Sequence, residues 1–146
     1  MVTEPSSMKR TWGQRLIVAW VGEIARILAL SLLCGFLIGT GLVLARFSEF
    51  SHMPDFVGYL TALIAGGFIG LLIRQMSHSL IAFLLTTVVS AVVSTLALSY
   101  PELQANRLGV ELAVQLSALQ GLTDSFFTVP FTLVGLLAGK WLSRSD

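Results

Sequence analysis

The sequence predicts an all-α protein, a polytopic membrane helix bundle with four transmembrane helices and additional interfacial amphipathic helices. Of the 146 residues, 55% are hydrophobic and 12% are charged, and the mean hydropathy is +0.84. Soluble domains usually carry about 25% charged residues, so about half of the usual charge is missing. Four apolar segments are each about long enough to cross a bilayer core as a helix. The segments between them are too short to fold alone.

The chain is expected to form one membrane domain after a short tail. Residues 1–11 are polar and predict a disordered tail, and residues 12–146 form the domain. In residues 12–26 charged side chains alternate with apolar ones, and Trp12 and Trp20 stand near the start. Because tryptophan favours the headgroup level, this segment is predicted to be an interfacial helix, or an extended first set of helical turns, that leads into the first span.

The first predicted span covers residues 27–45, which contain no charge and are closed by Arg46. Just before it, Glu23 and Arg26 are three residues apart and can pair on one helical face. A cleaved signal sequence over residues 1–45 is the alternative interpretation. However, the apolar run is longer than a usual signal core and begins too far from the amino end, so we expect the span to be retained.

The second and third spans are predicted over residues 56–73 and 80–98. The second lies between Asp55 and Arg74, and the third ends before Pro101. The segment between the two spans is short, which predicts an antiparallel helical hairpin.

The last third of the chain predicts a surface helix followed by the fourth span. In residues 102–121, polar and leucine side chains fall on separate sides at helical spacing, which is typical of an amphipathic surface helix. Residues 126–142 form the fourth span, with Thr123 or Asp124 as the expected N-cap. Pro130 is expected to kink this helix.

The distribution of basic residues predicts the orientation. An even number of spans places both termini on one side, and that side holds most of the Lys and Arg residues. They are Lys9, Arg10, Arg15, Arg26, Arg74, Lys140 and Arg144, against Arg46 and Arg107 on the other side. The positive-inside rule then predicts that both termini are cytoplasmic.

Small residues recur at every fourth position in three of the spans, and these stripes let helices approach closely. They are Ser31, Gly35 and Gly39 in the first span, Gly58, Ala62, Gly66 and Gly70 in the second, and Gly135 and Gly139 in the fourth. Packing within the bundle is the simpler interpretation. A stripe that faces a second protein is the alternative.

Hydroxyl side chains gather on the third and fourth spans and form a candidate polar path. They are Thr87, Ser90, Ser94, Thr128 and Thr132. Such hydroxyls usually bond to backbone carbonyls or to a neighbouring helix. No charged residue lies deep in any predicted span, although ion and proton pathways typically contain one.

Cofactor, metal and nucleic-acid chemistry find no support in the sequence. Cys34 is the single cysteine, which excludes an internal disulfide. His52 and His78 are predicted on opposite membrane faces and cannot share a metal ion. The basic residues are scattered and form no patch for nucleic acid. We therefore expect no cofactor, no metal and no nucleic-acid partner.

Three functions stay open from the sequence. The leading hypothesis is a non-enzymatic accessory, assembly or scaffolding subunit that packs on a membrane partner or on itself, surrounded by membrane lipid. The alternative is a small transporter or channel whose path forms between helices or protomers. A weaker hypothesis is a membrane enzyme or lipid-handling protein that uses Glu102, Glu111 and Asp124 on the outer face.

Overall fold

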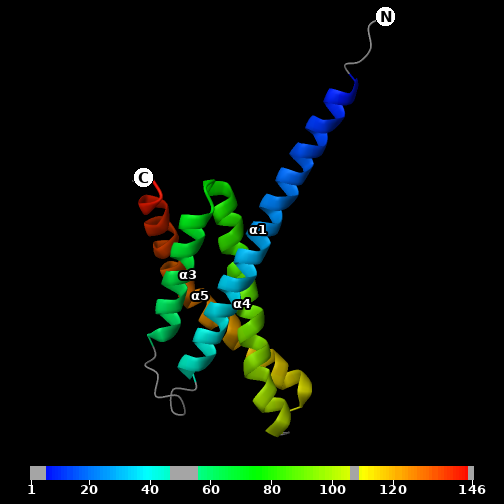
Figure 1. Ribbon diagram of the computed structural model, residues 1–146. Helices are drawn as coiled ribbons and strands as arrows, with labels where there is room; N and C mark the ends of the chain where they lie inside the picture. The colour runs from blue at the N-terminus through cyan, green and yellow to red at the C-terminus, as the bar shows by residue number, and fades with distance from the viewer. Residues whose placement is uncertain (1–5, 47–55, 106–108, 145–146) are drawn as a thin grey trace, which may run out of the picture.

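The computed structural model describes residues 6–46, 56–105 and 109–144, and every regular element in them is an α-helix. The helices are α1 (Ser6–Arg46), α3 (Val57–Leu72), α4 (Met76–Ala105) and α5 (Val110–Leu142) (Figure 1). Three of them contain stretches that are long and apolar enough to cross a membrane, by length and composition, and α3 is a shorter apolar helix. For the described residues, the predicted all-helical fold is confirmed.

The helices form a four-cornered arrangement in which each has two main neighbours. The helix α1 packs against α3 and α4, and α5 packs against the same two helices. Although α3 and α4 are joined by the short link at residues 73–75, they contact each other much less. The pairs α1/α5 and α3/α4 therefore lie on the two diagonals. Most helix contacts join segments that are distant in the sequence.

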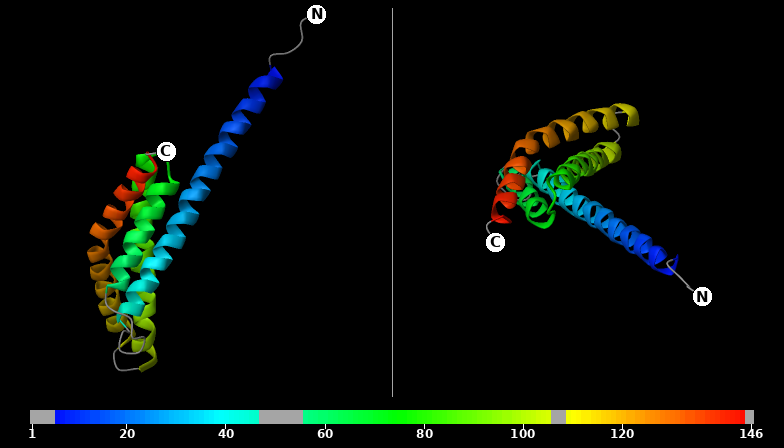
Figure 2. Two further views of the ribbon diagram at one scale, coloured as in Figure 1. Left: turned by 60° about the vertical axis from the view of Figure 1, so that its left-hand side comes forward. Right: turned by 90° about the horizontal axis from the view of Figure 1, so that it is seen from above.

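Two parts of the molecule extend beyond the four-helix region at opposite ends (Figures 1 and 2). The N-terminal part of α1 extends alone past the α3–α4 link. The C-terminal part of α4 and the N-terminal part of α5 extend together past the C-terminus of α1. Below, the end of the bundle with the link is called the α3–α4 end, and the other is called the Arg46 end.

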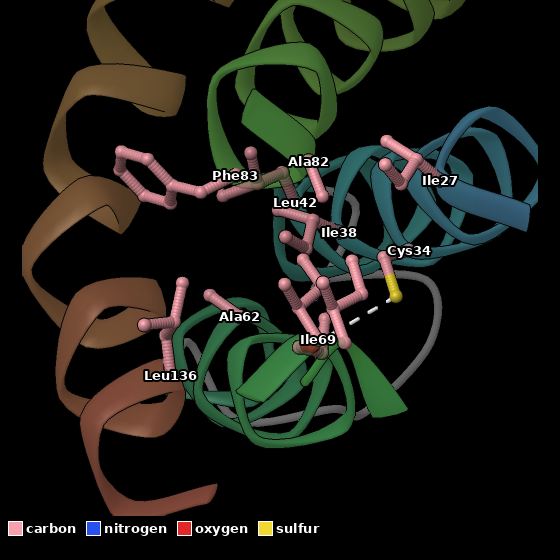
Figure 3. Close-up of a cluster of buried hydrophobic side chains, with 11 residues drawn as sticks. Ile27, Cys34, Ile38, Leu42, Ala62, Ile69, Ala82, Phe83 and Leu136 are labelled. Carbon is pink, nitrogen blue, oxygen red and sulfur yellow. Dashed lines mark hydrogen bonds between the residues drawn. The ribbon is translucent and has the colours of Figure 1, made fainter. Parts of the chain in front are cut away.

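The core lies where all four helices meet, and Figure 3 shows its buried side chains. It consists of Ile27, Cys34, Ile38, Leu42, Ala62, Ala65, Ile69, Ile73, Ala82, Phe83 and Leu136. Three members are alanines, so the helices come close together at these points. Close van der Waals packing of this kind is what holds helices together where no hydrophobic effect acts between them.

The helix α1 begins earlier than predicted and joins the segment 12–26 to the first span in one helix. It runs unbroken from Ser6 to Arg46, so there is no boundary between residues 11 and 12 or between residues 26 and 27. Residues 6–11 of the predicted tail are helical, and residues 1–5 lie outside the described residues. No proline interrupts the segment after Pro5, so the backbone bonds of the span continue toward the N-terminus.

The C-terminal end of α4 and the start of α5 also differ from the prediction. The helix α4 continues past Pro101 to Ala105, and α5 is one helix from Val110 to Leu142. The predicted surface helix 102–121 is thus divided between α4 and α5, and its second part is continuous with the fourth predicted span. Pro130 lies inside α5, which curves along its length in Figure 2.

Neither predicted N-cap acts as one, because α5 already begins at Val110. The hydroxyl of Thr123 donates to the carbonyl of Leu119, one turn back in the same helix. The carboxylate of Asp124 instead accepts from Arg46.

Candidate functional site

The small-residue stripes of α3 and α5 face each other. A Cβ atom on Gly66 would overlap the backbone carbonyl of Thr132, and one on Gly135 would overlap the carbonyl of Leu63. A Cβ atom on Gly70 would likewise overlap the carbonyl of Leu136, and one on Gly139 would overlap the carbonyl of Gly67. The two backbones are therefore in direct contact along two helical turns. This interface tolerates no side chain at these glycines without separation of the helices.

The stripe of α1 faces α4. A Cβ atom on Gly35 would overlap the side chain of Val89, and one on Gly39 would overlap that of Val93. The two glycines thus form the surface on which two branched side chains of α4 rest. Valine loses little side-chain freedom in such a contact, because its χ1 angle is already restricted in a helix.

The other stripe members are also directed into the bundle. The hydroxyl of Ser31 lies 2.7 Å from the carbonyl oxygen of Ile27 and 3.2 Å from that of Ala82 on α4. Gly58 faces Leu42 of α1. All nine predicted stripe residues are buried. None of them is exposed for a second protein in this structure.

The five candidate path residues lie on α4 and α5, and most are buried. Thr87 is half-buried, whereas Ser90, Ser94, Thr128 and Thr132 are at most 3% exposed. The three threonine hydroxyls donate to backbone carbonyls three or four residues earlier in their own helices. The hydroxyl groups of Ser90 and Ser94 have no hydrogen-bond partner among the described residues.

Sequence reasoning missed the part of the α4–α5 interface that Gly121 forms. A Cβ atom on Gly121 would overlap the hydroxyl of Thr95 and lie 3.2 Å from the carbonyl of Ala91. Ser117 and Ser125, one turn to either side, are buried. This series has a small residue at every fourth position, so the criterion used for the other stripes could have found it.

At the Arg46 end, Arg46 forms a two-point ion pair with Asp124. Nη2 of Arg46 lies 2.9 Å from Oδ1 of Asp124, and Nε lies 3.2 Å from Oδ2. With its amide oxygen turned toward the guanidinium, Gln120 accepts from Nη2 at 2.9 Å. This cluster joins the last turn of α1 to the middle of α5.

At the α3–α4 end, cations from two other helices bind the carbonyl groups that end α3. Nη2 of Arg26 donates to the carbonyl of Leu72 at 2.8 Å, and Nζ of Lys140 donates to that of Ile73. The last carbonyls of a helix lack partners within it and carry the negative end of its dipole, so cations stabilise them. The predicted Glu23–Arg26 pair is wrong, because Oε1 of Glu23 lies 2.9 Å from Nδ1 of His78.

An apolar groove of about 680 Å³ lies on the surface between α1 and α4. It is lined by Ala29, Leu32, Leu33, Phe36 and Leu37 of α1 and by Val89 and Val93 of α4. Its walls contain no charged residue, so the groove suits an acyl chain or an apolar side chain.

Two of the three carboxylates suggested for an enzyme, Glu111 and Asp124, lie far apart along α5. Asp124 is bound to Arg46, and Glu111 is exposed near the start of α5. The two are about 20 Å apart along the helix at 1.5 Å per residue. The side chain of Glu102 and the whole of His52 lie outside the described part of the structure. Within that part, no group of three or more His, Cys, Asp or Glu side chains is placed to hold a metal ion.

Comparison of the chain with protein families, with curated proteins and with solved structures finds no match.

Proposed function

We propose that this chain is an integral membrane protein that crosses the bilayer four times and serves as a non-enzymatic accessory, assembly or scaffolding subunit. Three helices with the length and composition of membrane spans support this proposal. The outer faces of the bundle are also apolar, as at Leu84 and Leu137, whose side chains are more than half exposed. A soluble monomer rarely exposes so much contiguous apolar surface.

The orientation with both termini in the cytoplasm belongs to the same proposal. Arg26, Arg74, Lys140 and Arg144 lie toward the α3–α4 end, whereas the basic Arg46 at the other end is paired with Asp124. This asymmetry supports placement of the α3–α4 end at the cytoplasmic face under the positive-inside rule.

The observation that carries the subunit proposal is the free N-terminal part of α1. Beyond the α3–α4 end, Ile17, Val18, Trp20 and Val21 are each more than half exposed. The glycine stripes are already used inside the bundle, so they do not provide the docking surface. An apolar face on a projecting helix is the form in which helices commonly dock into a groove of a partner.

A photo-crosslinker at Val18 tests this proposal in native membranes. Its matched control is a crosslinker at Leu84, an exposed apolar position on the outer face of α4. We expect a discrete protein adduct from Val18 and none from Leu84. The protein in this adduct should also copurify with the chain after mild detergent extraction. Adducts with lipid alone at both positions would contradict the subunit proposal. An adduct with a second copy would identify the partner as this chain itself.

The transporter or channel is the second candidate, because one observation favours it. Ser90 and Ser94 of α4 and Ser125 of α5 are buried hydroxyls without hydrogen-bond partners among the described residues. Buried polar groups without protein partners often bind water, and a water-containing path would use them. If the chain is a transporter, Ser90→Val and Thr132→Val change flux in reconstituted vesicles while assembly stays intact. Unchanged flux would exclude this path.

A further inference from the structure

Basic residues from three separate parts of the chain lie at the α3–α4 end. The contacts of Arg26 with the Leu72 carbonyl and of Lys140 with the Ile73 carbonyl bring α1 and α5 to the end of α3. Arg74 follows Ile73 directly, and Arg144 lies one turn after Lys140. The side chains of both arginines are exposed.

This end of the bundle carries excess positive charge. Glu23 is the carboxylate found there in the described part of the chain, and its Oε1 lies 2.9 Å from Nδ1 of His78. Neither Arg74 nor Arg144 forms an ion pair with any described residue, in contrast to Arg46 at the opposite end. With no carboxylate partner among the described residues, the two exposed guanidinium groups can bind an anion from outside the protein.

The hydrogen-bond donors at this surface suit a phosphate group. A guanidinium group presents a planar set of N–H groups that matches phosphate oxygens. Lys140 has three N–H donors, so the bond to Ile73 leaves two for other acceptors. Trp141, whose side chain is 73% exposed, lies at the same end of α5. Tryptophan is enriched at the headgroup level of membranes, so the residues of this surface are typical of a protein surface at that level.

We infer that the α3–α4 end binds the phosphate of anionic phospholipids, and that Arg74 and Arg144 make the main contacts beside Arg26 and Lys140. The inference rests on the proposed membrane insertion. The apolar groove favours a lipid over free phosphate, because it begins at Ala29, less than one helical turn from Arg26. An acyl chain attached to a headgroup at this end can therefore follow α1 into the groove.

Native mass spectrometry of the full chain in detergent, titrated with phosphatidylglycerol or phosphatidylcholine, tests the inference. Arg74→Gln and Arg144→Gln are the test variants, and Arg46→Gln removes one charge at the opposite end as the matched control. We expect the unchanged protein to prefer phosphatidylglycerol. Each test variant should weaken this binding about fivefold, because a basic residue near an anionic lipid surface contributes about 1 kcal/mol. The control should retain the affinity, with circular dichroism showing that all three variants are folded.

Three outcomes would overturn the inference. Equal binding of the two lipids would show that the phosphatidylglycerol charge is not recognised. An equal loss of affinity in Arg46→Gln would show a general charge effect. Displacement of the lipid by inorganic phosphate would show a site for free anions. Alkaline carbonate extraction separates the two proposals: release of the chain contradicts membrane insertion itself, whereas retention without lipid preference contradicts this inference alone.

Discussion

Arg46 and Asp124 join the two helices that lie on a diagonal of the bundle, with the Arg46 Nη2 and Nε atoms 2.9 and 3.2 Å from the Asp124 carboxylate. The arginine is in the last turn of α1, where a cation also suits the helix dipole. The side chain of Asp124 is 16% exposed and that of Arg46 is 45% exposed. This pair therefore adds a direct polar contact between α1 and α5, two helices that are otherwise held by their packing against α3 and α4.

Asp124→Asn and Arg46→Gln should each lower the free energy of unfolding by about 1 kcal/mol. The reason for this moderate value is that one partner is well exposed, and exposed ion pairs contribute at most about 1 kcal/mol. The double variant should lose less than the sum of the two single variants, because both changes remove the same contact. Thermal unfolding of the four proteins in detergent measures this. Strictly additive losses would show that the pair does not couple α1 to α5.

The positions of the small residues allowed the sequence to predict which faces are buried. All nine predicted members are buried, because spacing at every fourth residue is a property of one helix and needs no knowledge of its partner. The apolar run between Asp55 and Arg74 placed the second span within one residue of each end of α3. Which stripe meets which helix was not predictable, since this depends on the arrangement of all four helices.

Long-range contacts account for the parts of the structure that the sequence analysis did not predict. The sequence suggested local partners for Asp124 and Glu23, as an N-cap and as an ion pair within α1. Their partners Arg46 and His78 come from other helices. Of the two adjacent threonines in α4, Thr86 is buried, with 0% exposure, whereas the predicted path residue Thr87 is half-buried. The two threonines are chemically equal and differ only in the face of the helix on which they lie, and the packing of the neighbouring helices decides which face is buried.

Gly66→Ala should destabilise the bundle by about 1–3 kcal/mol, the usual cost of added volume in a packed interior. The added Cβ would meet the backbone carbonyl of Thr132, which cannot move aside as a flexible side chain can. Gly22→Ala is the matched control, because nothing lies within 4 Å of a Cβ atom there. Alanine favours a helix more than glycine, so the control should be neutral or slightly stabilising. Equal thermal stability of the two variants would contradict the close α3–α5 contact.

Ser90→Ala and Ser31→Ala should differ in sign or size, although both remove one buried hydroxyl. Ser90 has no hydrogen-bond partner among the described residues, so its replacement should be neutral or stabilising. Ser31 lies within hydrogen-bond distance of the carbonyls of Ile27 and Ala82, and its loss should cost about 1 kcal/mol. Unfolding midpoints in detergent compare the two variants. A larger loss from Ser90→Ala would show that its hydroxyl has a water or ligand partner, as the transport hypothesis requires.

Lys140→Met should weaken the end of α3, since it removes a buried donor to the Ile73 carbonyl and keeps the apolar length of the side chain. The loss should be only partial, because the Ser79 hydroxyl lies 3.2 Å from the same oxygen. The double variant Lys140→Met/Ser79→Ala should therefore lose more stability than the sum of the single variants, because a buried carbonyl left without any donor costs about 1–3 kcal/mol. Hydrogen exchange of the Ile73 amide, which bonds to the Ile69 carbonyl, measures the local effect. Lys140→Arg retains a donor and should preserve the protection of the Ile73 amide against exchange. If the amide is equally protected in Lys140→Met, the lysine does not stabilise this helix end.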